Sequence, residues 1–328
     1  MRGFAATGTA EGRRRFASGW ALAVVLILCF SLSGLAPARG QDGAPSASRT
    51  EGASGSQADN ISIFVSILPQ AAFLERIGGD RVAVEVLIGE GQSPHTYEPT
   101  PHQMAGLARA RAFFGIGVAA ERGVLRKMRQ SHPHLAIVET QKGIPFRHLE
   151  GHHHAAGEPR HNSGHKIPDP HVWMSPRLVK IQARNMCDAL ARLDPAHRQT
   201  YAANLRAFEA DLDRLDARLA RVLAPLKGKK MYVFHPAFGY FADAYGLVQI
   251  PIEIEGKEPG PRQLAALISQ ARKDGVKVLF VQPQFSPKSA AAVARAIGGV
   301  VAPIDPLARD YAANMERLAS AVEEGLNR

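Results

Sequence analysis

The chain has 328 residues, 45% of them hydrophobic, and a formal charge of +10. Its basic residues are spread along helical stretches and form no dense block, which argues against a nucleic-acid-binding protein. The two cysteines are Cys29 and Cys187, and Cys29 lies in an N-terminal apolar run that we expect to be removed. No internal disulfide is therefore expected in the mature chain.

Residues 1–38 have the three parts of an export signal. Arg13–Arg15 form a basic start, Trp20–Leu35 is a nearly unbroken apolar run, and Ala36–Ala38 is an Ala-x-Ala cleavage site. The apolar run is short for a transmembrane helix, so we expect a cleaved signal peptide and a periplasmic protein. An uncleaved membrane anchor is the alternative. Residues 39–60 are rich in Ser, Gly and Ala and are expected to form a flexible leader.

Strand-like and helix-like segments alternate from Ile61 onward. We expect strands at Ile61–Ile67, Val82–Ile88, Ala112–Ile116 and Ala136–Val138. We expect helices at Ala71–Ile77, Met104–Arg111, Glu121–Arg129 and Leu178–Leu193. This alternation predicts an N-terminal α/β lobe, residues 61–194, built on a mainly parallel sheet.

Residues 147–166 interrupt this lobe with a polar, low-complexity insertion that is unlike a packed segment. Imidazole is the commonest metal ligand among side chains, so we expect weak auxiliary metal sites here. A solvated linker whose histidines bind nothing is the alternative. The six candidate ligands are His148, His152, His153, His154, His161 and His165.

Pro195–Leu223 is the longest helical pattern in the chain. Apolar residues recur every three or four positions from Leu205 to Leu223, and Pro225 ends the pattern. At ~1.5 Å per residue, such a helix reaches ~42 Å, which is enough to run along two lobes. We therefore expect residues 195–225 to form a rigid linking helix.

Residues 226–328 repeat the α/β alternation in a C-terminal lobe. We expect strands at Lys230–Phe234, Val248–Ile252, Val276–Val281 and Gly299–Ile304. We expect helices at Phe238–Tyr245, Pro261–Asp274, Ser289–Ile297 and Tyr311–Leu326. The predicted fold class is α/β, with two lobes that each hold a mainly parallel sheet flanked by helices, joined by one long helix.

Four residues at loops after strands or before helices are candidate metal ligands: His95, His171, His235 and Asp305. Ligands gather at the carboxyl ends of strands in parallel sheets, and two of these candidates come from each lobe. Three imidazoles and one carboxylate suit zinc, whereas manganese prefers more oxygen. A lone histidine beside proline is more often a packing or capping residue than a ligand, whereas Asp305 alone equally suits a turn or helix cap.

Four segments carry a resemblance to a known family: Pro94–Pro101, Asp169–Pro176, Phe234–Tyr240 and Glu255–Pro259. Together they resemble the zinc/manganese solute-binding proteins of bacterial ABC transporters, of the metal-binding cluster A-I type, and favour the zinc-specific subgroup. The resemblance implies two lobes bridged by a rigid helix, with the metal held in the cleft between them. It also implies ligands at His95, His171 and His235, with Asp305 as the usual fourth.

The resemblance has two departures. Zinc-specific members carry a histidine-rich loop between the first two ligands, but the loop here is short and interrupted. Some of those members also carry an acidic residue just before the first ligand, where this chain has Pro94. The fourth position therefore falls to Asp305 or to water.

Our primary hypothesis is a monomeric periplasmic receptor, without enzymatic activity, that captures Zn²⁺ and delivers it to an ABC permease in the inner membrane. One alternative is an exported zinc-dependent hydrolase, in which three histidines leave an open zinc position. The sequence lacks a His-Glu-x-x-His motif, which weakens that alternative. The other alternative is a manganese-binding receptor or an adhesin on the same fold.

Overall fold

The computed structural model describes residues 60–149, 168–253 and 259–328, which lie in one compact unit, Ser56–Arg328. The expected signal peptide and nearly all of the leader lie outside the described residues. So do residues 150–166 of the histidine-rich insertion, Ile167 and most of the segment Glu255–Pro259. Among the described residues, no helix has the length and apolar character needed to cross a membrane.

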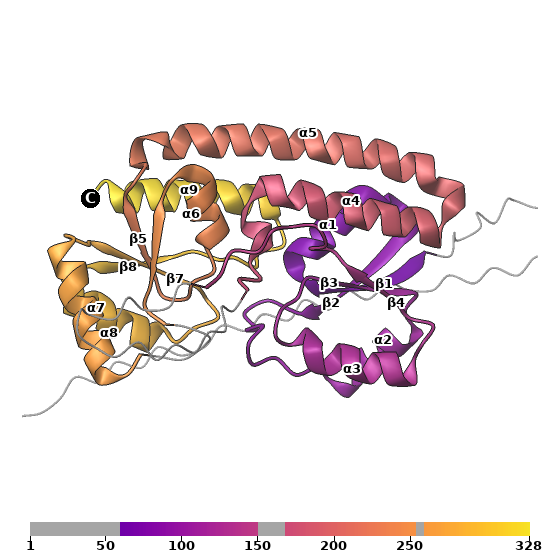
Figure 1. The fold of residues 1–328 in the computed structure, drawn as a ribbon, viewed down its shortest axis with the longest axis horizontal. Helices are drawn as coiled ribbons and strands as arrows, with labels where there is room; N and C mark the ends of the chain where they lie inside the picture. The colour runs from indigo at the N-terminus through magenta and orange to yellow at the C-terminus, as the bar shows by residue number, and fades with distance from the viewer. Residues whose placement is uncertain (1–59, 150–167, 254–258) are drawn as a thin grey trace, which may run out of the picture. The chain divides into compact units, whose positions relative to one another are not determined.

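The first lobe is built on a four-stranded parallel sheet in the order β2-β1-β3-β4 (Figure 1). Its strands are β1 (Ile61–Ile67), β2 (Val82–Ile88), β3 (Ala112–Gly115) and β4 (Ala136–Glu139). Its helices are α1 (Leu68–Gly78), α2 (Pro101–Arg109), α3 (Glu121–Ser131) and α4 (Pro176–Leu193), with 3-10 turns η1 (Gly79–Arg81) and η2 (Val172–Met174). Helices α1 and α4 lie on one side of the sheet and α2 and α3 on the other, so β1 is buried from Ile63 to Ile67.

The second lobe repeats this arrangement with the parallel order β6-β5-β7-β8. Its strands are β5 (Lys230–Val233), β6 (Val248–Pro251), β7 (Val278–Val281) and β8 (Val300–Pro303). Its helices are α6 (Gly239–Tyr245), α7 (Pro261–Lys273), α8 (Pro287–Ile297) and α9 (Tyr311–Leu326). The fold class expected from the alternation is confirmed in both lobes.

Helix boundaries follow capping chemistry that is visible in the sequence. Thr100 caps α2 by accepting the backbone N–H of Gln103 at 3.2 Å, and Pro101 occupies the first turn, where its missing N–H costs nothing. Gly246 and Gly298 end α6 and α8 in the left-handed conformation, with φ of 74° and 78°. Residues with a Cβ adopt that conformation at a cost, which explains glycine at both positions.

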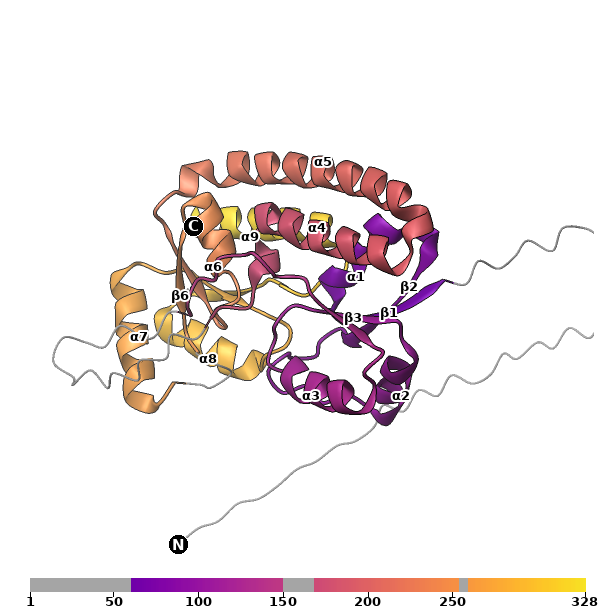
Figure 2. The same cartoon turned by 45° about the vertical axis from the view of Figure 1, so that its right-hand side comes forward.

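The long helix α5 (Arg198–Leu223, 26 residues) runs along both lobes, as Figures 1 and 2 show. It lies between the 3-10 turns η3 (Pro195–His197) and η4 (Ala224–Leu226). It packs on α1 and α4 of the first lobe and on α6 and α9 of the second. Its buried stripe consists of Tyr201, Phe208, Leu212, Leu215, Leu219 and Leu223.

The two lobes share a hydrophobic core beneath α5, and a second, smaller cluster lies between β5, β7, α7 and α8 of the second lobe. A single cluster of buried residues includes strands β1 and β3 of the first lobe and helices α6 and α9 of the second. Phe73 of α1 belongs to this cluster, with ring centroids 5.8 Å from Phe208 of α5 and 4.9 Å from Tyr311 of α9. Because such contacts are lost together, we expect the lobes to unfold as one unit.

Candidate metal site

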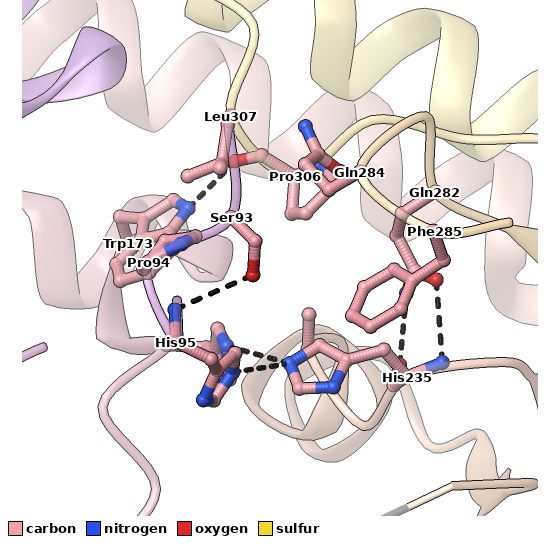
Figure 3. A pocket seen from close by; sticks show the side chains of 12 residues that line it. Ser93, Pro94, His95, Trp173, His235, Gln282, Gln284, Phe285, Pro306 and Leu307 are labelled. Atoms are coloured by element: carbon pink, nitrogen blue, oxygen red, sulfur yellow. Dashed lines mark hydrogen bonds between the residues drawn. The ribbon is translucent and has the colours of Figure 1, made fainter. Parts of the chain in front are cut away.

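Three imidazole nitrogens converge between the lobes. The Nε2 of His235 lies 3.1 Å from the Nε2 of His95 and 3.4 Å from the Nε2 of His171. Figure 3 shows the rings of His95 and His235 pointing toward one another across the pocket. Ligands of a tetrahedral zinc with Zn–N bonds of about 2.0–2.1 Å lie about 3.3 Å apart, so the observed spacing suits one shared ion.

The loop that carries His95 follows β2 and is anchored by Gln103 of α2. The Gln103 side chain accepts the N–H of Thr100 at 3.0 Å and the hydroxyl of Tyr97, and it donates to the carbonyl of Leu87 at 2.8 Å. The backbone N–H of His95 itself donates to the Ser93 hydroxyl at 3.3 Å. The loop is therefore tied to the end of β2 on one side and to the start of α2 on the other.

His171 is oriented by Asp169, two residues before it. One oxygen of Asp169 accepts the Nδ1–H of His171 at 2.7 Å and its backbone N–H at 3.0 Å. The other oxygen lies 3.1 Å from the guanidinium of Arg147. Burial acts to raise the pKa of Asp169, but the contacts with His171 and Arg147 outweigh it and lower that pKa.

His235 lies two residues after the end of β5 and is held on several sides. Its Nδ1 donates to Glu253, a residue 1% exposed that lies two residues after the end of the neighbouring strand β6. The Gln282 side chain accepts the His235 N–H at 3.2 Å and donates to its carbonyl at 2.8 Å. The Phe285 ring stacks on the imidazole with centroids 4.9 Å apart.

These contacts leave the converging nitrogens able to bind a cation. A carboxylate that accepts the Nδ1–H leaves the Nε2 lone pair of His171 and of His235 free. Burial lowers the pKa of His235 even though Glu253 acts to raise it. Burial, and then the neighbouring imidazoles of His235 and His171, lower the pKa of His95 to about 3. Neutral imidazole is the form that binds metal.

The pocket around these nitrogens is mostly apolar and aromatic. Trp173 closes one side, with its indole N–H donating to the Pro306 carbonyl at 2.7 Å, and Phe285 closes another. Among the described residues that line the pocket, none carries a carboxylate. The lining residues are Ser93, Pro94, His95, His171, Trp173, His235, Ala237, Gln282, Gln284, Phe285, Pro306 and Leu307.

Asp305, the expected fourth ligand, lies outside the group of candidate ligands. That group consists of His95, His171 and His235, whose ligand atoms all lie within 4.8 Å of one another. The Asp305 carboxylate instead accepts the backbone N–H of Leu307 at 2.9 Å and the Gln284 amide at 3.0 Å. Asp305 therefore caps the turn after β8, a role that its position before Pro306 also suits.

The structure describes one of the six expected auxiliary histidines. His148 is described and forms an antiparallel bridge with Pro168, which brings the two ends of the insertion together. The other five lie outside the described residues: His152, His153, His154, His161 and His165.

The sequence alone did not identify Glu253 or Arg147 as functional residues. Asp169 was part of a family-like segment, but no role in orienting a ligand was predicted for it. Glu253 had one usable signal, because it follows the strand β6, which lies beside the His235-bearing strand β5. The carboxyl ends of adjacent parallel strands meet at one edge of the sheet. Arg147 had no such signal, since it lies at the start of the polar insertion.

Comparison with known proteins gives a consistent result. Residues 63–325 match the family model described as "Zinc-uptake complex component A periplasmic". The chain is 31% identical over 255 residues to the high-affinity zinc uptake system protein ZnuA of Bacillus subtilis, covering 76% of this chain and 80% of that protein.

Solved structures agree. The crystal structure of ZnuA is 41% identical, with a TM-score of 0.74, and the match covers 81% of this chain and 99% of that one. A ZnuA deletion mutant with zinc bound is also 41% identical with a TM-score of 0.74, covering 82% and 98%. Because the family model spans both lobes and all three converging histidines, this chain belongs to the family of periplasmic component A of zinc-uptake complexes.

Proposed function

We propose that this protein is the zinc-binding receptor of an ABC-type zinc import system. It captures Zn²⁺ with the Nε2 atoms of His95, His171 and His235 and delivers the ion to a membrane permease. The observation that carries the proposal is the convergence of these three nitrogens at distances of 3.1 and 3.4 Å. Membership in the zinc-uptake family supports the same cargo.

The donor set favours zinc over manganese. Three neutral imidazoles form a nitrogen-rich, borderline site, whereas manganese prefers oxygen ligands. The carboxylates of Asp169 and Glu253 lie behind two of the rings and offset part of the cation charge through the imidazoles. This arrangement places negative charge near the ion without using a carboxylate as a direct ligand.

We propose that water completes the zinc coordination and that Asp305 keeps its capping role. The Asp305 oxygen already accepts two hydrogen bonds, from Leu307 and Gln284. Both contacts fall on Oδ1 and orient the carboxylate toward the turn after β8. Gln284 and Pro306 line the pocket, but Asp305 does not.

A zinc-dependent hydrolase with the same three ligands is the less favoured function. A zinc-bound water needs a general base within hydrogen-bond reach. The carboxylates of Asp169 and Glu253 are both engaged by the Nδ1 atoms of ligand histidines. Since the described lining of the pocket itself supplies no carboxylate, we propose a binding protein and no enzymatic activity.

The proposed setting is the periplasm, with the protein acting as a monomer that docks on an inner-membrane permease. Helix α5 and the shared core oppose a wide hinge motion between the lobes. Zinc release is therefore proposed to use a small tilt or a rearrangement of the His95 loop, since His95 is the least buried of the three ligands.

A competition titration of metal-free protein against a chromophoric zinc chelator tests the proposal. We expect tight binding of one Zn²⁺ per chain and a large loss of affinity in His95→Ala. His102→Ala removes an exposed histidine of α2 and serves as the matched control, with unchanged affinity expected. Absence of tight one-to-one binding, or equal binding by His95→Ala, would overturn the proposal. Hydrolysis of esters or peptides that disappears on zinc removal would favour the enzyme.

A further inference from the structure

Arg147 connects the loop that carries His171 to the second lobe. Its Nη1 lies 3.1 Å from the Asp169 carboxylate, and its Nε lies 3.0 Å from Asp243 of α6. Its guanidinium also lies over the Tyr240 ring, 5.8 Å from the centroid. The Arg147 side chain is 15% exposed and that of Asp169 is fully buried, so this ion pair is screened less than a surface pair, whereas Asp243 is 60% exposed.

The backbone around Arg147 is fixed by the same neighbours. The Asp169 N–H donates to the Arg147 carbonyl at 2.9 Å. The Arg147 N–H donates to the Tyr240 hydroxyl, which in turn donates to the Asp169 carbonyl, both at 3.0 Å. These three hydrogen bonds hold the backbones of Arg147 and Asp169 against Tyr240 of α6.

Helix α6 has room for the guanidinium because it begins with glycine. A Cβ built at Gly239 would lie only 1.6 Å from the Nη1 of Arg147. Gly239 is buried in the first turn of α6 and does not have a positive φ, so its backbone conformation would accept alanine. Its missing side chain therefore serves the approach of Arg147.

Asp169 transmits this contact to a ligand. It is completely buried, with one oxygen on the His171 imidazole and the other on Arg147. If the guanidinium were absent, one oxygen of a buried carboxylate would lose its charged partner, which is costly and favours a different rotamer. A turned carboxylate would no longer hold the His171 ring toward the other two ligands.

We propose that Arg147 is a positioning residue for metal binding. It fixes Asp169, which fixes the ring of His171, and its contact with Asp243 holds this loop against the lobe that supplies His235. The inference rests on the proposed zinc binding and assigns the orientation of one ligand to an arginine outside the pocket.

Four variants separate the parts of this arrangement. Arg147→Ala is expected to lower zinc affinity roughly tenfold, the lower end of the range for partners behind metal ligands, chiefly through faster release. Gly239→Ala displaces the guanidinium without changing charge, and a similar loss is expected. Asp243→Ala removes only the ion pair with the 60% exposed Asp243 and is expected to cost at most about threefold. Arg184→Ala breaks an exposed ion pair with Glu209 and is the control, with unchanged affinity expected.

A double-mutant cycle tests whether Arg147 acts through Asp169. We expect Asp169→Asn alone to lower affinity about tenfold or more, and adding Arg147→Ala to change it by less than about twofold. Arg147→Lys keeps the charge and is expected to recover part of the affinity. Full additivity of Arg147→Ala and Asp169→Asn, or wild-type binding by Arg147→Ala, would overturn the inference.

Nitrogen NMR of metal-free protein supplies a readout that does not need zinc. We expect the His171 Nδ1–H signal to be sharp and shifted downfield in wild type and in Arg184→Ala, and lost or moved in Arg147→Ala. An unchanged His171 signal in Arg147→Ala would contradict positioning. Failure of wild type to bind zinc would defeat the proposed function but leave this NMR comparison intact.

Discussion

Glu253 tests how much zinc affinity depends on groups behind the ligands. The change is Glu253→Gln, which preserves shape but removes the negative charge that accepts the His235 Nδ1–H. Both side chains are buried, with 5% of His235 and 1% of Glu253 exposed, so little solvent screens the contact. Loss of such a partner typically lowers metal affinity about 10–100-fold, which corresponds to about 1.4–2.7 kcal/mol.

The stability of the metal-free protein is expected to respond differently. The second oxygen of Glu253 is buried and has no hydrogen-bond partner among the described residues. A neutral amide is less costly to bury than a carboxylate with an unpaired oxygen. We therefore expect Glu253→Gln to leave the free energy of unfolding of metal-free protein unchanged or raised, while zinc binding weakens.

Chelator competition measures the affinity, and urea unfolding of chelator-treated protein measures the stability. Glu209→Gln is the matched control, because Glu209 pairs with the 56% exposed Arg184 on the surface, and less than about twofold change in affinity is expected. Zinc binding by Glu253→Gln within about twofold of wild type would refute the reasoning that charge behind His235 supports the ion. A large loss of stability without zinc would show instead that Glu253 mainly holds the fold.

Four further outcomes are expected. Zinc at 100 times its dissociation constant should stabilise the wild type by about 2.7 kcal/mol in thermal unfolding, and should give no such shift in His95→Ala. Phe73→Ala should cost about 3–5 kcal/mol and keep a single unfolding transition; two separate transitions would contradict a core shared by the lobes. Burial lowers the pKa of His95 to about 3 and also lowers the pKa of His235, so the unfolded chain binds more protons below about pH 6.5. Metal-free protein should therefore be less stable to urea at pH 5 than at pH 7.5, and equal stability would contradict the buried neutral imidazoles. Asp305→Asn should keep zinc affinity within about threefold by chelator competition, because the amide oxygen still accepts from Leu307; a loss of tenfold or more would identify Asp305 as a ligand.

The secondary structure was largely readable from the sequence. The predicted strands Ile61–Ile67 and Val82–Ile88 and the helix Tyr311–Leu326 match the structure residue for residue. These elements can be recognised from local sequence. A buried parallel strand is a short apolar run, and a helix is bounded by capping residues. The start of the long helix differs, because Pro195–His197 forms a 3-10 turn before α5 begins at Arg198.

The family and its preference for zinc could also be predicted from the sequence, because each of the three histidines lies in a short contiguous motif that contains proline. The predicted fold class is confirmed by the two parallel sheets and the likeness to solved ZnuA structures, and the family by the match over residues 63–325. The roles of individual residues as ligands stay proposals. The convergence of His95 and His235, 140 residues apart, became visible only in the folded chain.

Other features were decided by tertiary structure alone. The shared core around Phe73, the carboxylate of Glu253 behind His235 and the reach of Arg147 to α6 join segments with no common sequence pattern. Asp305 lies outside the ligand group and accepts hydrogen bonds from Leu307 and Gln284. Periodicity and motifs report the environment of neighbouring residues, whereas the orientation of a ligand depends on contacts supplied by distant parts of the chain.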